Sequence, residues 1–534
     1  MSFLFWHRDR FRGCFRRERA DLSRMNRPLE AASLSSKHPA PADPSPVIAF
    51  DNSYARLPER FYERIAPTPV AAPALIRVNR ALAQRLRIDP DFLMSDEGVA
   101  ILAGNALAEG SEPIALAYAA HQFGHFVPQL GDGRAVLLGE VLDKDGKRFD
   151  IQLKGSGRTR FSRRGDGRAA LGPVLREYIV SEAMAALGIR TTRSLAAVLT
   201  GERVMREWAA PGGIVTRVAS SHLRVGTFQY FAAQGDGEAL RLLADYTIQR
   251  HYPDAAAADD PCLALFEAVA GALADLTASW MLIGFIHGVL NTDNTSIAGE
   301  TIDYGPCAFM DAYHPDKVFS SIDRNGRYAF GQQPLIMKWN LARFGETLLP
   351  LMAGTPEAVM TAANEKLAHF DARYQQAYLA GLRKKLGLST AQPGDLQLGE
   401  DLLQRMAANR ADFTLTFRAL SEASADPARD ADVQKLFADP AAFGEWAERW
   451  RQRLAQEGQE PEARRAAMRA VNPVFIPRNH RIEQVIAAAE QGDLQPFNEL
   501  NAVLEKPYDD QPEMARYALA PAPQEEVQQT FCGT

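Results

Sequence analysis

Apolar and polar positions in the first half of the chain alternate in short runs, as they do in strands with one buried face. The runs at residues 135–142 and 148–154 predict two strands, and the Asp-Lys-Asp-Gly sequence at 143–146 is typical of a hairpin turn between them. Residues 126–130 predict a shorter strand, followed by the glycine turn 131–134. We therefore expect three consecutive antiparallel strands with a glycine turn at the first corner.

Helical periodicity takes over in the second half, from about residue 237 to residue 517. It predicts helices over residues 262–284, 357–386 and 402–420, and the strand-rich part has one helix of its own, at 169–187. The fold class expected from this order is α+β, with a small mixed α/β N-terminal lobe and a large, mainly helical C-terminal lobe. Functional sites favour the interface between two such lobes.

The predicted helix at 262–284 is apolar enough to raise the question of a membrane span. Glu267 and Asp275 interrupt it, and ionisable residues are rare inside a bilayer. Its apolar residues recur at helical spacing, which favours a core helix: Cys262, Leu265, Phe266, Val269, Leu273, Leu276, Trp280 and Ile283. We expect a protein without membrane contact.

Composition excludes further classes. The 534 residues are 46% hydrophobic and 24% charged, and the net charge of −6 argues against a general nucleic-acid binder. The four cysteines are too scattered for a disulfide scaffold or a Cys-x-x-Cys zinc site. We expect a cytoplasmic monomer that binds no nucleic acid.

Basic residues concentrate at the N-terminus. Residues 1–45 hold nine Lys and Arg against five Asp and Glu, and the segment ends in a Pro- and Ala-rich stretch. We expect residues 1–46 to form a basic, disordered extension. A targeting presequence, or a start of translation at Met25, is the alternative.

A glycine turn, a lysine and a glutamate follow one another in an order that suits phosphate binding. Gly131-Asp-Gly-Arg134 precedes the strand pair, and Lys154 ends its second strand. In protein kinases, backbone amides of a glycine turn and a strand lysine hold nucleotide phosphates, and a helix glutamate pairs with that lysine. Glu177 has the place of this glutamate, although a solvated surface glutamate fits the pattern as well. The glycine turn alone is more typical of an ordinary hairpin.

A second set of kinase-like positions follows the helix at 262–284. His287 and Asn294 take the histidine and metal-binding asparagine positions of the HRDxxxxN pattern, and Asp303 begins an Asp-Tyr-Gly resembling the DFG site. The position of the catalytic aspartate holds Val289, which cannot titrate, whereas Asp293 directly precedes the asparagine. The order predicts a protein-kinase-like two-lobed fold that is either catalytically inactive or uses its nucleotide differently.

Longer motifs make the chain resemble the selenoprotein O family, also called the YdiU family, of pseudokinase-like protein adenylyltransferases. The resemblance runs from about residue 50 to the C-terminus and leaves out the basic extension. The motifs that carry it are His121-Gln-Phe-Gly124, Pro128-Gln-Leu-Gly-Asp-Gly-Arg134, Leu153-Lys-Gly-Ser-Gly-Arg-Thr159, residues 287–294, Tyr304-Gly-Pro-Cys307, Tyr328-Ala-Phe-Gly331, Trp339-Asn-Leu-Ala-Arg343 and Pro477-Arg-Asn-His480.

This resemblance implies an enzyme that transfers AMP from ATP to Ser, Thr or Tyr hydroxyls of other proteins. It implies that ATP binds flipped relative to ordinary kinases, so that the α-phosphate faces the acceptor. Mg²⁺ or Mn²⁺ is the implied cofactor, ATP the co-substrate and proteins the implied partners, with uridylylation from UTP and Mn²⁺ as a further activity.

The resemblance also implies site residues, position by position. Asp293 would accept the proton, and Asn294 and Asp303 would ligate the metal. The nucleotide would contact Gly131, Gly133, Arg134, Lys154, Asp166, Gly167, Arg217, Arg224 and Asp303. Without the resemblance, Arg217 and Arg224 would be taken for surface charges.

Two other functions stay open, a kinase-fold phosphotransferase and a non-catalytic pseudokinase scaffold. Val289 argues against the first, and the retained Lys154, Asn294 and Asp303 argue against the second. Three parts are expected: the basic extension 1–46, an N-terminal region and nucleotide-binding lobe at 47–235, and a helical catalytic lobe with the C-terminal tail at 236–534.

Cys532 stands where some family members carry selenocysteine, third from the end of the chain. We hypothesise a reversible disulfide between Cys532 and Cys307, which lies just beyond Asp303. Two free thiols are the alternative.

Overall fold

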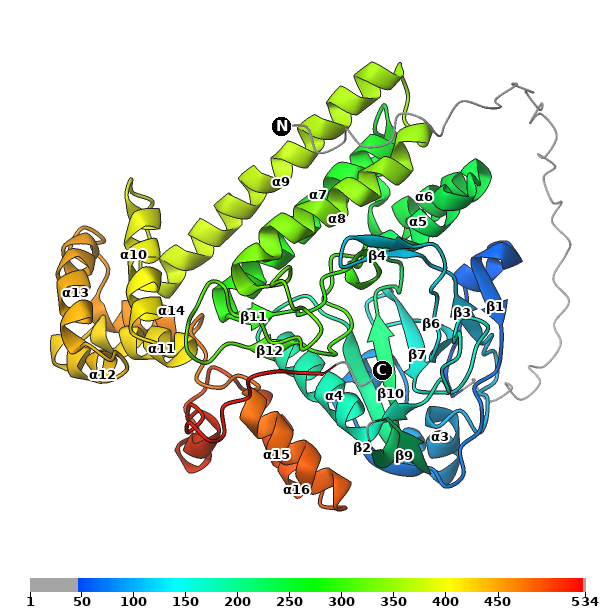
Figure 1. Cartoon of the computed structure of the whole chain (residues 1–534), viewed down its shortest axis with the longest axis horizontal. Helices are drawn as coiled ribbons and strands as arrows, with labels where there is room; N and C mark the ends of the chain where they lie inside the picture. Colours follow the sequence, from blue (N-terminus) through cyan, green and yellow to red (C-terminus); the bar gives the residue numbers. More distant parts are fainter. Residues whose placement is uncertain (1–46, 207, 532–534) are drawn as a thin grey trace, which may run out of the picture.

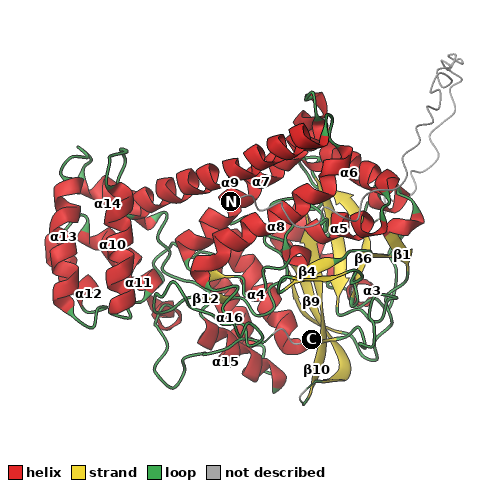
Figure 2. Cartoon of the chain, turned by 45° about the horizontal axis from the view of Figure 1, so that its top comes forward, coloured by secondary structure: helices red, strands yellow, loops and turns green. Residues whose placement is uncertain are grey.

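The structure is a computed structural model that describes residues 47–206 and 208–531 (Figure 1). Our expectation for the basic extension 1–46 lies outside the described residues, as do Cys14 and Cys532. Strands gather on one side of the molecule and helices fill the other, so the predicted α+β, two-lobed fold class is confirmed (Figure 2).

One antiparallel sheet organises the N-terminal part. The predicted strands at 135–142 and 148–154 are confirmed as β6 and β7, and Asp143 N–H donates to the Lys147 carbonyl (2.8 Å) in the turn between them. The order across the sheet is β1 (Tyr62–Arg64), β3 (Ile114–Leu116), β6 (Ala135–Leu142), β7 (Arg148–Lys154), β10 (Ala209–Ala219), β9 (Arg193–Met205) and β2 (Ala74–Val78), with β8 (Ala169–Ala170) beside β10.

Helices cover both faces of this sheet. On one face Leu82, Leu93 and Leu102 pack against strand residues such as Ile151 and Val198; they come from α1 (Arg80–Arg85), α2 (Pro90–Leu93) and α3 (Asp96–Leu102). The other face carries α4 (Leu171–Ala186), which confirms the predicted helix at 169–187. Because α4 is buried between the sheet and the C-terminal part, residues on it can reach the space between the lobes.

The predicted pairing of residues 126–130 with the next strand is wrong. The strand found there, β5 (His125–Val127), pairs with β4 (Ala120–Gln122) in a separate hairpin. Beyond Pro128 the chain turns along residues 116–118, where Leu130 N–H donates to the Tyr118 carbonyl and Asp132 N–H to the Leu116 carbonyl, both at 2.9 Å. The glycine turn is therefore a loop between two sheets and not a hairpin corner.

A bundle around α7 (Pro261–Ile283) forms the centre of the helical part (Figure 1). It packs against α8 (Gln333–Leu348) and α9 (Pro356–Lys385), with α5 (Val225–Gln234) and α6 (Gly237–His251) nearby. By length and composition alone α7 could cross a membrane, but Leu265, Val269 and Leu273 on it are fully buried in the protein core. The core helix predicted at 262–284 and the helix predicted at 357–386 are both confirmed.

At the far end of α9 lies a helical module around a second hydrophobic core, which also takes in the end of α7 and parts of residues 286–330 (Figure 1). It consists of α10 (Asp395–Ala408), α11 (Phe413–Ala423), α12 (Asp430–Gln434), α13 (Pro440–Leu454) and α14 (Pro461–Arg469). The prediction of a single helix at 402–420 is wrong, because the helix is interrupted between α10 and α11. Arg410 there has a left-handed φ of 52°, and Asp412 both caps Leu415 N–H (2.8 Å) and pairs with the buried Arg478 (2.8 Å).

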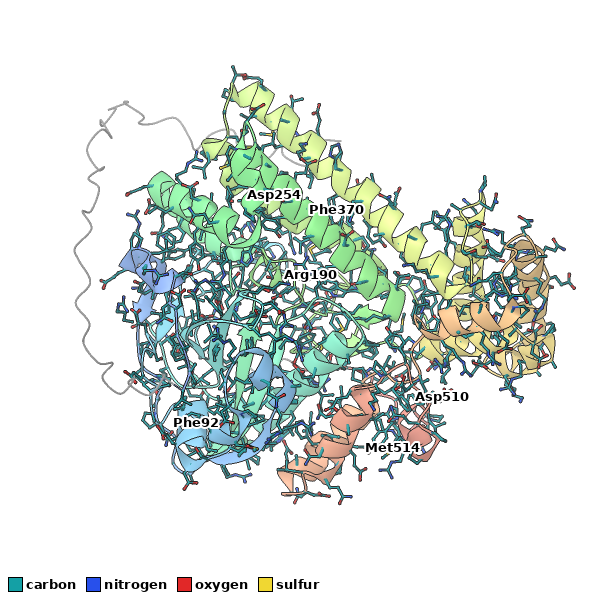
Figure 3. The ribbon with its side chains drawn as sticks, turned by 180° about the vertical axis from the view of Figure 1, so that it is seen from behind. Phe92, Arg190, Asp254, Phe370, Asp510 and Met514 are labelled. Atoms are coloured by element: carbon teal, nitrogen blue, oxygen red, sulfur yellow. The ribbon has the colours of Figure 1, made fainter. Side chains whose placement is uncertain are left out.

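The chain then returns to the N-terminal lobe. α15 (Asn479–Glu490) and α16 (Gln495–Leu504) pack on α4. The segment that follows, marked by Asp510 and Met514 in Figure 3, lies beside the helical module, where Asp510 pairs with Arg418 at 2.6 Å. The C-terminal segment thereby ties the module to both lobes.

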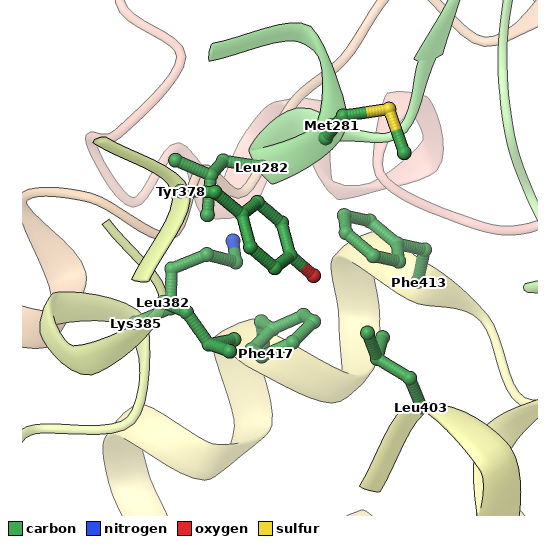
Figure 4. Close-up of a pocket in the computed structure, with 8 residues that line it drawn as sticks. All are labelled: Met281, Leu282, Tyr378, Leu382, Lys385, Leu403, Phe413 and Phe417. Carbon is green, nitrogen blue, oxygen red and sulfur yellow. The ribbon is translucent and has the colours of Figure 1, made fainter. Parts of the chain in front are cut away.

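A small apolar cavity of about 10 Å³ lies where α7, α9, α10 and α11 meet (Figure 4). Its lining includes Lys385, the last residue of α9, whose ammonium nitrogen lies 4.2 Å from the centre of the Phe417 ring and 5.5 Å from that of Phe413. Burial lowers the pKa of Lys385 to about 7. No hydrogen bond or ion pair joins its side chain to the residues that the structure describes.

Candidate active site

A cavity of about 1090 Å³ holds all eleven residues to which the resemblance assigned a role. It is lined by the glycine loop after β5, the end of β7, the loop at 158–168, β10, the start of α5 and residues 289–305. Side chains and loops from both lobes therefore meet in one space large enough for a nucleotide. Its volume lies just above the range of about 300–1,000 Å³ that is usual for ligand sites.

Lys154 lies at the centre of the charged cluster in this cavity. Its Nζ is 2.5 Å from Glu177 Oε2 and 2.7 Å from Asp303 Oδ1. The lysine comes from the end of β7 and the glutamate from the second turn of α4, so the pair links the sheet to its covering helix. The predicted pairing of Lys154 with Glu177 is confirmed, and the alternative of a solvated glutamate is wrong.

Two arginines complete the cluster. Arg217 Nη1 lies 2.8 Å from Asp303 Oδ1, and Arg224 Nη1 lies 3.3 Å from Asp303 Oδ2. Only 2% of Arg217 and 3% of Arg224 is exposed, so taking them for surface charges, as the local pattern suggested, is wrong. Gln152 accepts a hydrogen bond from Arg217 (2.6 Å), and the Arg224 guanidinium lies 4.5 Å from the centre of the Tyr118 ring. Each of these contacts holds one guanidinium in a single orientation.

Asp303 is the point where these three cations meet. Burial opposes ionisation of this carboxyl, but Lys154, Arg217 and Arg224 together hold its pKa well below the usual value. Its φ of 66° lies in the left-handed region, which a non-glycine residue occupies only when its surroundings impose it. His287 contributes to this restraint, because its Nε2 donates to the carbonyl of the adjacent Ile302 (2.9 Å).

Asp293 has a different environment in the same cavity. Gln122 Nε2 donates to its Oδ2 at 3.0 Å, while its Oδ1 is buried and has no hydrogen-bond partner among the described residues. Burial raises the pKa of Asp293 to about 6, against the opposing effect of Arg224. Of the four aspartates that line the cavity, Asp303 is therefore held as a carboxylate, whereas the raised pKa of Asp293 lets it take up a proton more readily.

The glycines of the site are required by packing. Gly131 has a φ of 82°, and a Cβ there would lie 2.3 Å from the Phe161 ring. A Cβ on Gly167, with a φ of 72°, would lie 2.1 Å from the Gly157 backbone. The first contact packs the glycine loop against the loop at 158–168, and the second holds the two ends of that loop together. On the same loop, Asp166 pairs with Arg206 at 2.9 Å. Both loops line the cavity through backbone as well as side chains.

The oxygen donors of the site suit a divalent cation of the magnesium type. Asn294 donates its amide hydrogen to the Val289 carbonyl (2.8 Å), which leaves its side-chain oxygen without a partner in the described chain. Together with the Asp303 carboxylate this is a hard donor pair, of the kind that binds Mg²⁺ jointly with substrate phosphates. No group of three His, Cys, Asp or Glu that could hold a metal ion by itself occurs in the part of the chain that the structure describes.

The end of the described chain lies near this site. Thr530 donates through its hydroxyl to the Pro306 carbonyl (2.6 Å) and through its backbone to the Phe319 carbonyl (2.7 Å). Pro306 directly precedes Cys307, so the tail passes beside that cysteine. Because Cys532 lies outside the described residues, the disulfide between Cys307 and Cys532 stays a prediction.

Four residues of the site had no role in the sequence analysis: Tyr118, Gln122, Asp132 and Gln152. Asp132 is fully buried and accepts from Gln152 Nε2 (3.0 Å) and Leu116 N–H (3.2 Å). Gln122 and Asp132 belong to the quoted motifs His121-Gln-Phe-Gly124 and Pro128-Gln-Leu-Gly-Asp-Gly-Arg134, which were the only signal for them. The contacts of Tyr118 and Gln152 join residues far apart in sequence and leave no local pattern.

Comparison with known proteins agrees with the resemblance. The family described as "Protein adenylyltransferase SelO" matches residues 46–505. A protein of Nitrobacter hamburgensis described as "Protein nucleotidyltransferase YdiU" is 68% identical over 504 residues, 94% of this chain and 99% of the relative. Proteins of the same description from Rhodopseudomonas palustris strain BisB5 and Bradyrhizobium sp. strain ORS 278 are 65% and 64% identical, each over 91% of this chain and 99% of the relative.

Proposed function

The chain belongs to the protein adenylyltransferase SelO family, and from this premise we propose that it is a nucleotidyltransferase that moves AMP from ATP to Ser, Thr or Tyr hydroxyls of target proteins. The observation that carries the proposal is the convergence of Lys154, Arg217 and Arg224 on Asp303, beside an aspartate with a raised pKa. We further propose a cytoplasmic monomer whose partners are proteins.

The cationic cluster supports chemistry at a phosphate. Attack of a hydroxyl at the α-phosphorus forms a P–O bond to the acceptor and expels pyrophosphate, so negative charge must be stabilised on both the transferred and the leaving group. In the proposed complex, Lys154 and the two arginines exchange part of their contact with Asp303 for phosphate oxygens. Arginine suits this role because its guanidinium can bind two phosphate oxygens at once.

We propose Asp293 as the acceptor of the hydroxyl proton. Val289 occupies the position of a kinase's catalytic aspartate and has no group to accept a proton. Asp293 lines the same cavity, and a pKa near 6 leaves it ionised at neutral pH yet basic enough to take the proton as the acceptor oxygen bonds to phosphorus.

The remaining assignments follow the family. We propose that Gly131, Gly133, Arg134, Asp166 and Gly167 contact the nucleotide with the cationic cluster. Asn294 and Asp303 would hold Mg²⁺ or Mn²⁺, which supplies charge neutralisation at the phosphate oxygens when bound. The lobes at 47–235 and 236–534 would then meet across the nucleotide. Transfer of UMP from UTP with Mn²⁺ is proposed as a second activity of the same site.

Labelled ATP tests the proposal directly. We expect label from the α-phosphate, and none from the γ-phosphate, to remain on protein after incubation with Mg²⁺ or Mn²⁺. Retention of γ-label would instead indicate a kinase, and absence of both labels a non-catalytic scaffold. EDTA should abolish transfer and excess Mg²⁺ or Mn²⁺ should restore it.

The matched variants are Asp303→Ala and Asp254→Ala. Asp254 is an exposed aspartate on the helical lobe, away from the cavity (Figure 3). We expect transfer to be lost in the first variant and unchanged in the second. Transfer that survives in Asp303→Ala would exclude the assigned metal site.

A further inference from the structure

Gln122 lines the cavity and touches Asp293, but none of the roles described so far includes it. It lies at the end of β4, in the small hairpin that projects from the N-terminal part over residues 291–294. Its amide nitrogen donates to Asp293 Oδ2 at 3.0 Å. The other carboxylate oxygen, Oδ1, stays buried without a partner in the described chain.

A closed ring of hydrogen bonds holds the residue before Gln122 in place. His121 N–H donates to Thr292 Oγ1, the Thr292 hydroxyl donates to Gln229 Oε1, and Gln229 Nε2 donates to His121 Nδ1, each at 2.7 Å. The ring requires a neutral imidazole, because Nδ1 must accept. Burial lowers the pKa of His121 to about 4, so the imidazole stays neutral throughout the physiological range.

The residue after Gln122 is held in the same way. Phe123 N–H donates to Asn291 Oδ1 at 3.1 Å, and the Tyr328 hydroxyl donates to the same oxygen. His121 and Phe123 are therefore bonded to Thr292 and Asn291, the two residues that precede Asp293. These hydrogen bonds fix the backbone on both sides of Gln122 and so hold its side chain next to Asp293.

From this geometry we propose that Gln122 is a positioning residue that holds one oxygen of Asp293 so that the other is oriented to accept the proton of the incoming hydroxyl. The inference rests on the proposed function and deepens it. A neutral amide suits the task, since it fixes the carboxylate without adding charge. A lysine would pair with Asp293 and weaken it as a base, and a glutamate would repel it.

The proposed role acts through Asp293 alone. If Gln122 works by holding that carboxylate, its loss should cost nothing further once Asp293 is replaced by Asn. A role in stability alone would lower activity in both backgrounds.

The test compares Gln122→Met, which keeps the length and loses the donor, with His125→Ala. His125 is an exposed residue of the same hairpin outside the cavity lining, so it controls for disturbance of the hairpin. For Gln122→Met we expect kcat for α-label transfer to fall about 10- to 100-fold, with KM for ATP within about twofold of wild type. In an Asp293→Asn background we expect Gln122→Met to change kcat by less than about twofold.

Gln122→Glu serves as a second variant if Gln122→Met folds poorly. It keeps the length of the side chain but places a carboxyl group that repels Asp293, so kcat should fall at least as far as in Gln122→Met. Unchanged kcat in both variants, or the same fall in kcat in the Asp293→Asn background, would overturn the inference. Failure of wild type to transfer α-label would instead refute the proposed function itself.

Discussion

Lys154 and Lys385 are both largely buried, yet their surroundings are opposite. Lys154 lies in the large cavity between the lobes and contacts two carboxylates, at 2.5 and 2.7 Å. Lys385 lies beside the small apolar cavity against two phenylalanine rings, with no carboxylate partner in the described chain. The charge of Lys154 is compensated by carboxylates in the proposed nucleotide site, whereas burial of an uncompensated amine where α9 meets α11 costs stability.

The largest expected effect comes from removing the carboxylate on which the cations of the active site converge. Asp303→Asn keeps the side-chain shape but leaves Lys154, Arg217 and Arg224 without their shared anion and weakens metal binding. We expect α-label transfer to fall by about 10³-fold or more. The measurement is transfer rate with Asp254→Asn as control, and activity within tenfold of wild type would contradict the assignment.

Lys154→Met tests the lysine itself. The substitution removes one cation from the proposed phosphate site and leaves Glu177 paired only with Arg217, at 3.3 Å. We expect transfer to fall by about 10²- to 10³-fold, together with weaker ATP binding in calorimetry. The same substitution at Lys385 should leave the transfer rate unchanged. An equal fall in transfer rate in both variants would show that the two lysines do not differ in function.

The pH dependence of transfer tests the role of Asp293. Because a proposed base must be ionised to act and burial raises the pKa of Asp293 to about 6, we expect activity to be nearly full at neutral pH and to fall about tenfold per pH unit below pH 6. Asp293→Asn should lower kcat and remove this limb. An acidic limb near pH 4 in the wild type would contradict the raised pKa.

The smallest expected effect concerns stability. Lys385→Met replaces a buried amine with an apolar side chain of similar length. The amine binds its proton more weakly in the folded state, where its pKa is about 7, than in the unfolded chain. Between pH 7 and the unfolded pKa of about 10.4, the unfolded state therefore binds more protons and wild-type stability rises with pH.

Lys385→Met should consequently stabilise the protein by about 1–3 kcal/mol below pH 7, and less at alkaline pH. Thermal unfolding of both proteins at pH 6.5 and 9.5 measures the difference. A lower melting temperature for the variant at pH 6.5 would show that contact of the ammonium with the Phe417 ring outweighs the cost of burial.

Local patterns predicted several of the main helices and strands with good accuracy. β6, β7, α4, α7 and α9 lie within two residues of their expected bounds, because alternation, helical periodicity and turn residues are properties of neighbouring positions. The prediction for residues 402–420 was wrong because a tertiary contact ends the helix: the buried Arg478 pairs with Asp412, which caps the next helix. That partner is more than sixty residues away in sequence.

The amino-acid sequence by itself determined the fold class, the family and the order of the chemically important residues, because long motifs carry that information in one dimension. Only the tertiary structure decided which charges are buried together. Arg217 and Arg224 became part of the site because β10 and the start of α5 turn them toward Asp303. Gln122 reached Asp293 across 171 positions, through a hairpin held by hydrogen bonds. Burial and charge pairing depend on distances in space, and these set the pKa values on which the proposed chemistry rests.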